Sequence, residues 1–544
     1  MDDCNIAAVL GRVAAERGDE AALVVKKRRG YRRYSFHELN FNRQDFAARL
    51  ICAGIGPGDR VMLMVRPSME FICLTFALFS IGAVVILIDP GMGYRNLLRC
   101  IQSVKPDILI GIPKAVLFSR LFPRPFATVR KRICVGRGFG VLGESLAVLK
   151  PAMKGQDFAA ATDDLAAIIF TTGSTGPPKG VQYTHGIFHA QLHLIKEYYG
   201  IGPGEVDQPA FPLFALFSTA LGACAVIPDM DPSRPAKVNP QRFIRSLMDE
   251  KVTYSFGSPA IWNVVSRYCL DKRITLPVKK ILMAGAPVPG ELVERLAKII
   301  PTDGEIHTPY GATESLPIAS INGREIVRDC WPLTGRGRGV CVGRPLPDIT
   351  ITIIRPVEGP IGDWQQAREL DSGEIGEIVV KGPVVTRAYD HNPAETQMAK
   401  ITDGDSFRHR MGDMGYFDTS GRLWFCGRKA HVVHTADGPM YSICCEGIFN
   451  THPQVVRSAL VGVGEAGAQK PVLLVEKVAG MDESTLISQL RDLAGQHELT
   501  RSIATFFVHP GFPVDIRHNA KIFREKLALW AEKKLQGHSC RDGL

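Results

Sequence analysis

Residues 165–184 read LAAIIFTTGSTGPPKGVQYT, and this stretch decides the fold class. The apolar run LAAIIF is short, which is typical of a buried strand. It leads directly into residues 170–180, where four hydroxyl side chains, three glycines and one lysine stand close together. Glycines let backbone N–H groups approach an anion, hydroxyls add donors and a lysine adds positive charge. We therefore expect a phosphate-binding loop, although it is no Walker loop because Pro178 stands where that motif needs glycine.

Length and composition indicate a large soluble protein. At about 150 residues per domain, 544 residues predict roughly two to four domains. The 22% charged and 45% hydrophobic residues exclude disordered, collagen-like and coiled-coil classes. The net charge of +10 favours anionic partners such as nucleotides, phospholipid surfaces or nucleic acid. Thirteen cysteines without a CxxC pair indicate neither a disulfide framework nor a zinc module, and favour a cytoplasmic protein.

Two stretches invite other interpretations. Residues 71–88, FICLTFALFSIGAVVILI, just reach the length of a membrane span, but Gly82 interrupts them. We expect two buried elements joined by a glycine turn, and neither export nor a transmembrane segment, while peripheral membrane contact stays open. The basic run KKRRGYRR at 26–33 predicts an exposed hairpin that turns near Gly30, and no nucleic-acid site.

The order of elements predicts an α/β organisation. Up to about residue 425, helix-like stretches alternate with short apolar runs such as DRVMLM, DILIGI, KKILMAGAP and GEIVVKG. From about residue 430 the elements become shorter, and they include PVLLVEKV and a final helix-like IFREKLALWAEKK. We expect a second, smaller α+β domain there.

FTTGSTGPPKG resembles the phosphate-loop signature of the adenylate-forming superfamily, which includes acyl-CoA synthetases, luciferases and the adenylation domains of peptide synthetases. Further motifs follow in that family's order along nearly the whole chain. They are GAP at 285–287, YGATE at 310–314, GEIGEI at 373–378, MGDMG at 411–415, Gly427-Arg428, and Asn519-Ala520-Lys521.

The resemblance implies a fold, a substrate and roles for residues. It implies a large N-terminal domain of layered α/β subdomains, residues 1–427, and a small mobile α+β lid domain, residues 428–544. ATP and Mg²⁺ are the implied cofactors, and Glu314 is the implied magnesium ligand. The implied phosphate-binding residues are Thr171, Thr172, Gly173, Ser174, Thr175, Gly176 and Lys179. The resemblance implies that the rest of the nucleotide is bound by Gly285, Ala286, Pro287, Tyr310, Gly311, Thr313, Asp413 and Arg428. The implied catalytic residues are Lys521, Glu314, Thr172 and Lys179.

Three features of the sequence depart from the family pattern. Hinge motifs in the family usually carry an aspartate and a lysine where this chain has His431 and His434. The segment TADGPMYSICCE lacks the Gly-Gly and Pro-x-Glu pattern of members that form thioesters. In FPLFALF, Ala215 replaces the histidine of many acyl-CoA synthetases, which we expect to open apolar space for a long or branched acyl chain.

With these departures, the sequence is most similar to the β-lactone synthetases of bacterial long-chain olefin biosynthesis. The resemblance implies adenylation of a 2-alkyl-3-hydroxy acid, followed by attack of its own 3-hydroxyl to give a β-lactone, AMP and pyrophosphate. Hydrophobic hydroxy acids and neighbouring pathway enzymes are the implied partners. Candidates for the base that accepts the hydroxyl proton are His431, His434 and His307, by residue type only.

Three alternatives remain at this point. A fatty acyl-CoA or acyl-AMP ligase would share the ATP site and differ only after adenylation. A metallohydrolase is suggested by His185, His189 and His193, which stand at helical spacing, although no HExxH motif accompanies them. We favour a helix packed behind the phosphate loop. A non-catalytic lipid-binding or scaffold protein is suggested by the altered hinge alone.

Overall fold

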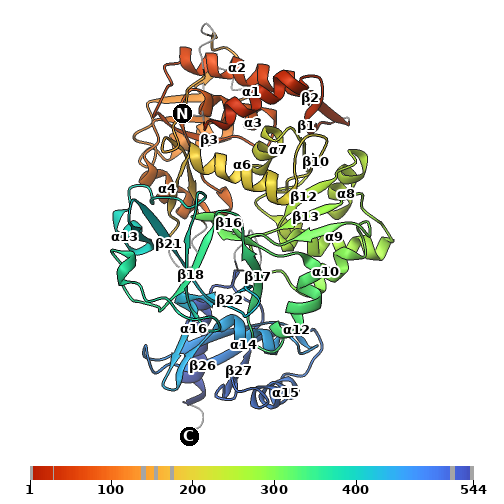
Figure 1. Ribbon diagram of the computed structural model, residues 1–544, viewed down its shortest axis with the longest axis vertical. Helices are drawn as coiled ribbons and strands as arrows, with labels where there is room; N and C mark the ends of the chain where they lie inside the picture. The colour runs from red at the N-terminus through yellow and green to blue at the C-terminus, as the bar shows by residue number, and fades with distance from the viewer. Residues whose placement is uncertain are drawn as a thin grey trace.

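The computed structural model describes residues 4–28, 30–136, 143–151, 157–171, 177–514 and 521–539. Figure 1 shows a large N-terminal part, red to green, above a smaller C-terminal part in blue. This is the mixed α/β architecture, with a large and a small domain, that the sequence predicted.

The first sheet contains the strand that precedes the phosphate loop. Its strands are parallel except β9, which runs antiparallel to β8. Their order is β7 (Glu144–Ser145), β6 (Lys131–Cys134), β5 (Ile108–Gly111), β3 (Arg60–Met64), β4 (Val84–Leu87), β8 (Leu165–Phe170) and β9 (Gly180–Thr184). Residues 71–88 form most of helix α3 (Met69–Ser80), a turn at Gly82 with a φ of 73° and strand β4, as predicted. Within the described residues, no helix is long and apolar enough to cross a membrane.

The second sheet is also largely parallel, and the basic run lies at its edge. The order is β14 (Glu305–His307), β13 (Lys280–Met283), β12 (Tyr254–Gly257), β10 (Val206–Asp207), β11 (Cys224–Ile227), β1 (Ala21–Lys26) and β2 (Tyr31–Ser35). Strands β1 and β2 are antiparallel, with Lys26 opposite Tyr31, and Gly30 has a φ of 80°. The predicted hairpin is therefore confirmed.

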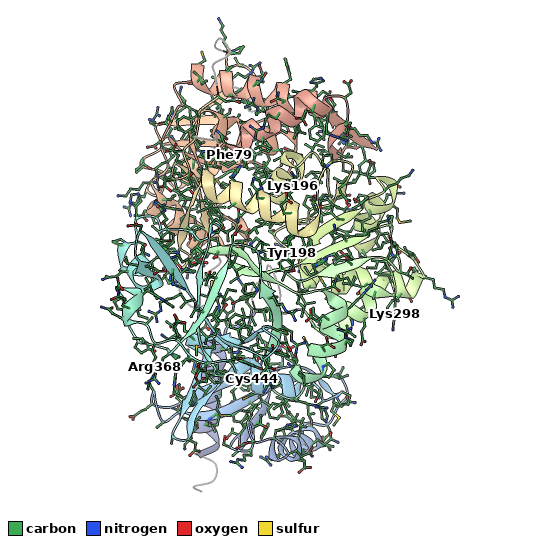
Figure 2. All side chains as sticks on the ribbon, viewed as in Figure 1. Phe79, Lys196, Tyr198, Lys298, Arg368 and Cys444 are labelled. Carbon is green, nitrogen blue, oxygen red and sulfur yellow. The ribbon has the colours of Figure 1, made fainter. Side chains whose placement is uncertain are left out.

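Helices of the two sheets pack on one another and bury the largest core. These helices are α1 (Ile6–Arg17), α2 (Phe36–Cys52), α3, α6 (His185–Tyr199) and α7 (Phe214–Ala220). Phe79 of α3 lies in this core, 5.4 Å between ring centroids from Phe188 of α6, and Figure 2 labels it in the upper part of the molecule. The phosphate-loop strand β8 therefore stands on a rigid base.

The third sheet is antiparallel. The sequence pattern did not distinguish its strands from the strands of the α/β layers. Its order is β15 (Tyr310–Ala312), β16 (Ser315–Ser320), β17 (Val340–Pro345), β22 (Leu423–Arg428), β21 (Ser406–Phe417), β19 (Gly376–Lys381) and β18 (Thr350–Ile354), with β20 (Lys400–Asp403) paired to β21. GEIVVKG, one of the runs behind the α/β prediction, forms β19 of this sheet. Strand spacing alone does not reveal direction, because short apolar runs occur in both kinds of sheet.

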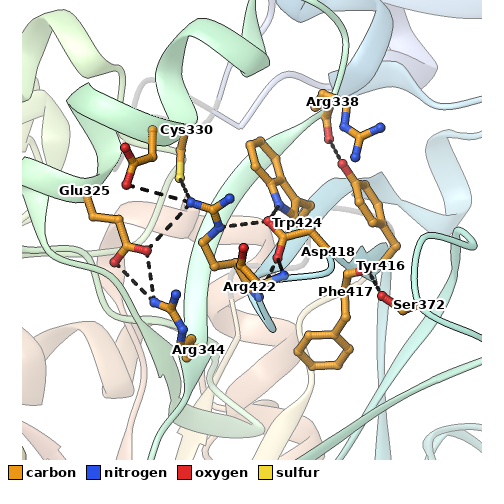
Figure 3. Close-up of polar contacts among 12 residues, drawn as sticks. Glu325, Cys330, Arg338, Arg344, Ser372, Tyr416, Phe417, Asp418, Arg422 and Trp424 are labelled. Atoms are coloured by element: carbon orange, nitrogen blue, oxygen red, sulfur yellow. Dashed lines mark hydrogen bonds and ion pairs between the residues drawn. The ribbon is translucent and has the colours of Figure 1, made fainter.

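A polar network centred on Arg422 connects the β21–β22 turn of this sheet with β17 and with helix α11 (Gly323–Glu325) (Figure 3). Arg422 Nε and Trp424 Nε1 both donate to Asp418 Oδ2, at 2.8 and 2.9 Å. Arg422 Nη1 also lies 3.8 Å from Glu325 Oε1, and Arg344 donates to the same carboxylate oxygen at 2.9 Å. The network fixes the turn that joins β21 to β22, the two strands that carry Asp413 and Arg428.

The C-terminal part follows directly after Arg428. It consists of η5 (Lys429–His431), the hairpin β23 (Val433–Thr435) and β24 (Gly438–Met440), α14 (Ser442–Phe449), β25 (Val455–Val463), β26 (Lys470–Lys477), α15 (Glu483–Gly495), β27 (Thr505–Val508) and α16 (Arg524–Ser539). Cys444 of α14, labelled in Figure 2, packs toward β22 of the third sheet. The division at residues 427/428 and the mobility of the lid stay predictions.

Candidate active site

A cavity of about 980 Å³ lies where the three sheets and the C-terminal part meet, and we call it the cleft. Every predicted site residue that the structure describes contributes to its wall. These residues are Thr171, Lys179, Gly285, Ala286, Pro287, Tyr310, Gly311, Thr313, Glu314, Asp413, Arg428 and Lys521. The other five, Thr172, Gly173, Ser174, Thr175 and Gly176, lie outside the described residues. The sequence thus predicted which distant segments converge, while the individual roles stay predictions.

Asp413, Arg428 and Tyr310 form a polar group on one side of the cleft. Strand pairing places Asp413 opposite Arg428, with 3.0 Å between Oδ1 and Nη1. Tyr310 donates its hydroxyl to Asp413 Oδ2 at 2.5 Å. Burial raises the pKa of Tyr310 well above its ordinary value, so this hydroxyl keeps its proton. Burial also raises the pKa of Asp413, whereas the charge of Arg428 and the tyrosine hydrogen bond act against that rise.

Glu314 lies in the tight turn between β15 and β16. Its Oε1 accepts a hydrogen bond of 2.8 Å from the Tyr389 hydroxyl. Its main-chain oxygen accepts two more, from Thr386 N and Thr386 Oγ1, each at 2.9 Å. A side chain at Gly311 would place Cβ 2.5 Å from Ser315 O, so only glycine fits this turn. The carboxylate is therefore fixed from several directions.

Lys179 marks the far end of the phosphate loop. Its backbone N–H donates to Thr171 Oγ1 at 3.3 Å, and the Thr171 N–H donates back to Lys179 O at 3.0 Å. The ammonium forms an ion pair with Glu395 and lies 5.1 Å from the centre of the Tyr389 ring. An anion in the loop would compete with Glu395 for this ammonium.

Two further segments complete this side of the cleft. Gly285 to Pro287 follow the carboxyl end of β13, and Gly285 has a φ of 97°, which favours glycine. Lys521 comes from the C-terminal part, and its positive charge acts against the burial-driven rise in the Asp413 pKa. The cleft therefore brings a lysine from the far end of the chain close to the Asp413 group.

The opposite wall is aromatic. Phe211, Phe214, Phe217 and Phe256 line it, and the rings of Phe214 and Phe256 stack with centroids 3.9 Å apart. Ala215, which we expected to open apolar space, is fully buried in the helix core and is not among the cleft-lining residues. The apolar space comes instead from the aromatic side chains that flank it on α7.

A buried acid interrupts this aromatic wall. Asp207, 1% exposed, accepts a 2.5 Å hydrogen bond from Ser218 at Oδ2, while Oδ1 accepts none within the described residues. Burial raises the pKa of Asp207 to about 8, so at neutral pH this carboxyl is largely protonated. Sequence reasoning missed Asp207, since a lone acid before GlnPro carries no recognisable pattern.

Lys400 and His409 were also missed. They face each other on β20 and β21, behind the Glu314 turn. Lys400 Nζ donates to the main-chain oxygen of Thr386, the residue that holds Glu314, and burial lowers the Lys400 pKa to about 7. His409 is 2% exposed and lines the cleft, and burial lowers its pKa well below the ordinary value. No local sequence signal marks either residue, because strand pairing creates their environment.

The three histidines proposed as bases differ in their position relative to the cleft. His431 and His434 line the cleft, whereas His307 is not among the lining residues and contacts Glu305 at 3.1 Å. Burial, then the charges of Arg524 and Arg428, lower the pKa of His431 to about 3. His431 is therefore neutral near pH 7.

The metallohydrolase alternative receives no support from the described residues. His185, His189 and His193 do lie on one helix, α6, as expected. His185 is fully buried against Phe79, while the rings of His189 and His193 touch each other, 4.7 Å between centroids. Among the residues described, no three His, Cys, Asp or Glu side chains are grouped closely enough to hold a metal ion.

The residues present fit a nucleotide with magnesium. Asp413 Oδ1 accepts no hydrogen bond from the described part of the chain, although it is buried beside Arg428. A ribose hydroxyl would satisfy this oxygen. Tyr389 occupies Glu314 Oε1, which leaves Oε2 for a hard cation such as Mg²⁺.

Sequence comparison agrees with this geometry. The chain belongs to the AMP-binding enzyme family, whose profile matches residues 10–390. It is 46% identical to the olefin β-lactone synthetase of Stenotrophomonas maltophilia, over 98% of this chain and 99% of that one. It is 45% identical to the enzyme of the same name from Xanthomonas campestris, over 98% of each chain.

Among solved structures, the fold matches the O-succinylbenzoate coenzyme A synthetase of Bacillus subtilis in complex with ATP and magnesium ion. The TM-score is 0.75 at 20% identity, and the match covers 95% of this chain and 98% of that one. At this identity the likeness shows the fold of adenylate-forming enzymes.

Proposed function

We propose that the protein is a β-lactone synthetase that activates a long-chain 2-alkyl-3-hydroxy acid with ATP. The observation that carries this proposal is the end-to-end similarity to two olefin β-lactone synthetases, at 46% and 45% identity. The cleft supports it, because one continuous cavity has a polar wall of nucleotide-type residues and an aromatic wall suited to alkyl chains. ATP and Mg²⁺ are then its cofactors.

The first step joins the carboxylate of the acid to the α-phosphorus of ATP and breaks the bond to pyrophosphate. Both reactants are anions, so the step requires positive charge and hydrogen-bond donors around the phosphates. Lys179 and Lys521 supply charge from two distant parts of the chain, and Asp413 with Arg428 holds the ribose. Bound magnesium, held by Glu314, would neutralise further phosphate charge.

The second step is intramolecular. The 3-hydroxyl oxygen attacks the acyl carbon, the bond from that carbon to the AMP oxygen breaks, and the hydroxyl proton passes to a base. The nucleophile is already attached to the substrate, so no second substrate needs to enter. His431 and His434 both line the cleft, and His434 is the candidate base because His431 is too weak a base at a pKa of about 3.

The protein is further proposed to work in the cytoplasm beside enzymes that make the hydroxy acid and consume the lactone. Supply requires a reaction that leaves a hydroxyl at carbon 3, and consumption requires loss of carbon dioxide from the lactone to give an alkene. Motion of the C-terminal part over the cleft would separate the two steps.

The test supplies ATP, Mg²⁺ and a 2-alkyl-3-hydroxy acid, with and without CoA, and analyses the products by NMR. The expected result is β-lactone and AMP, equally without CoA. The matched control is the same acid without its 3-hydroxyl, which should release pyrophosphate once per enzyme and then stall as bound acyl-AMP. Thioester formed only with CoA would make the protein an acyl-CoA ligase. Fatty-acid binding without pyrophosphate release would make it a non-catalytic lipid-binding protein.

A further inference from the structure

One surface outside the cleft combines exposed apolar side chains with positive charge. It lies on α4 (Tyr94–Val104), α5 (Pro113–Leu121) and the residues after α5, and we call it the α4–α5 face. Its apolar side chains are Tyr94, Leu117, Leu121 and Phe122, exposed by 74%, 46%, 67% and 42%. Its basic side chains, all exposed, are Arg95, Arg99, Lys114, Arg120 and Arg124.

The apolar residues form one continuous patch. Leu117, Phe118 and Leu121 stand at spacings of three and four on α5, so they share a helix face. The Phe118 ring joins the two helices, with centroid distances of 5.9 Å to Tyr94 and 4.8 Å to Phe122. Phe118 also packs edge-on against the buried ring of Phe126, which fixes the patch to the core of the first sheet.

The charge of this region is strongly one-sided. Residues 91–132 contain nine basic residues and a single acid, Asp107. Arg130 pairs with Asp59 at 2.7 Å, and Lys131 with Glu144 at 3.8 Å. Arg95, Arg99, Lys114 and Arg124 make no ion pair within the described part of the chain. These four side chains therefore add unneutralised positive charge to the face that carries the apolar patch.

The face begins beside the cleft. Gly91, just before α4, lies against Ser233, since a Cβ added there would be 3.5 Å from Ser233 Cβ. Pro232 and Pro235, on the same loop as Ser233, line the cleft. The N-terminal end of α4, with Tyr94, is therefore close to a rim of the cavity that receives the substrate.

We propose that the α4–α5 face docks the protein on anionic phospholipid bilayers. Exposed aromatic and leucine side chains enter the interfacial region of a bilayer, and surrounding arginines bind anionic headgroups. A bilayer matches both properties at once, whereas a zwitterionic or uncharged surface leaves the basic residues without partners. Docking on a bilayer does not depend on the proposed function. Only the delivery of an acyl substrate from the bilayer to the cleft rests on the proposed function.

The experiment measures sedimentation of the full-length protein with vesicles. Vesicles that contain phosphatidylglycerol should carry the protein down, whereas pure phosphatidylcholine vesicles should not, and about 0.5 M salt should release it. Leu121→Ser with Phe122→Ser, and separately Arg95→Glu with Lys114→Glu and Arg124→Glu, should each weaken binding about tenfold or more.

Matched controls lie elsewhere on the surface. Phe41→Ser with Val456→Ser removes two side chains that are 63% and 60% exposed, and should leave vesicle binding unchanged. Arg267→Glu with Lys272→Glu and Lys298→Glu reverses as many charges on and beside α9 (Pro259–Lys272) and α10 (Gly290–Ala297). These helices lie across the molecule from α4 in Figure 1, and Figure 2 shows Lys298 projecting outward. It should reduce binding far less than reversal on the face.

Three results would overturn the proposal: no binding to anionic vesicles, equal loss in face and control variants, or a dimer that the face variants abolish. The last would make the face a contact between two copies. Pyrophosphate release from a short, water-soluble hydroxy acid should be normal in the face variants, so a failed docking experiment is distinguishable from a failed assignment of the reaction.

Discussion

Asp413 and Arg428 face each other across the paired strands β21 and β22, and their side chains lie 3.0 Å apart inside the cleft. The negative charge of Asp413 raises the pKa of Arg428. One oxygen of Asp413 is bound by Tyr310, and the other accepts no hydrogen bond from the described residues. The antiparallel pairing thus presents a fixed carboxylate oxygen to a ligand.

Replacing Asp413 by asparagine should raise the KM for ATP about tenfold or more, because an amide accepts a ribose hydrogen bond less strongly than a carboxylate. Initial rates of pyrophosphate release at varied ATP measure this. Asp405→Asn, an exposed acid on the adjacent β20–β21 turn, is the control. An unchanged KM for ATP in Asp413→Asn would remove this residue from the nucleotide site.

Glu314→Gln and Lys521→Ala should each slow adenylation about a hundredfold or more while the fold stays intact. The first variant weakens the proposed magnesium ligand, and the second removes the charge expected at the reacting carboxylate. Pyrophosphate release gives the rate, and circular dichroism checks the fold. Undiminished release from either variant would refute the role assigned to that residue.

Lys400→Met should slow adenylation roughly tenfold, since it removes the ammonium that holds Thr386 behind Glu314. The methionine keeps most of the volume, so packing should survive. Lys381→Met is the comparison, because Lys381 pairs with Asp403 at 2.7 Å on the same sheet but lies away from Glu314. If both variants turn over like the parent protein, Lys400 has no positioning role.

Asp207 should give the protein a pH-dependent stability. Its pKa rises from 3.8 to about 8 on folding, so between these values the folded state holds more protons than the unfolded state. Stability from this group therefore falls as pH rises through that window, by at most about 1.4 kcal/mol per pH unit. Denaturant unfolding of Asp207→Asn at pH 5 to 8 should show a shallower decline than the parent protein. An identical decline would place the Asp207 pKa outside this range.

His431→Asp should stabilise the hinge, because a carboxylate at this position would stand near the guanidinium groups of Arg428 and Arg524, whose charges act on His431. A gain of about 2 °C in Tm is expected for one partly buried ion pair. His434→Asp, at an exposed position of the same hinge, is the control. A fall in Tm specific to His431→Asp would show that the two arginines do not face this side chain.

The sequence alone determined local elements of secondary structure and the turns between them. LAAIIF predicted strand β8, Gly82 the break between α3 and β4, and Gly30 the turn of the β1–β2 hairpin, because each depends on neighbours within a few residues. The ordered motifs also predicted which segments meet at the cleft, from Thr171 to Lys521. The motifs carry this information because each one has a distinct combination of glycine residues, hydroxyl groups and charged side chains.

Only the tertiary structure decided what lies between those motifs. The antiparallel direction of the third sheet, the pairing of Lys400 with His409, and the isolation of Asp207 in an aromatic wall all depend on contacts between distant segments. A side chain's pKa and hydrogen bonds are set by burial and by charges brought close in space. Sequence neighbours do not encode that environment, which is why a lysine with a pKa of about 7 and an aspartate with one of about 8 look ordinary in the printed sequence.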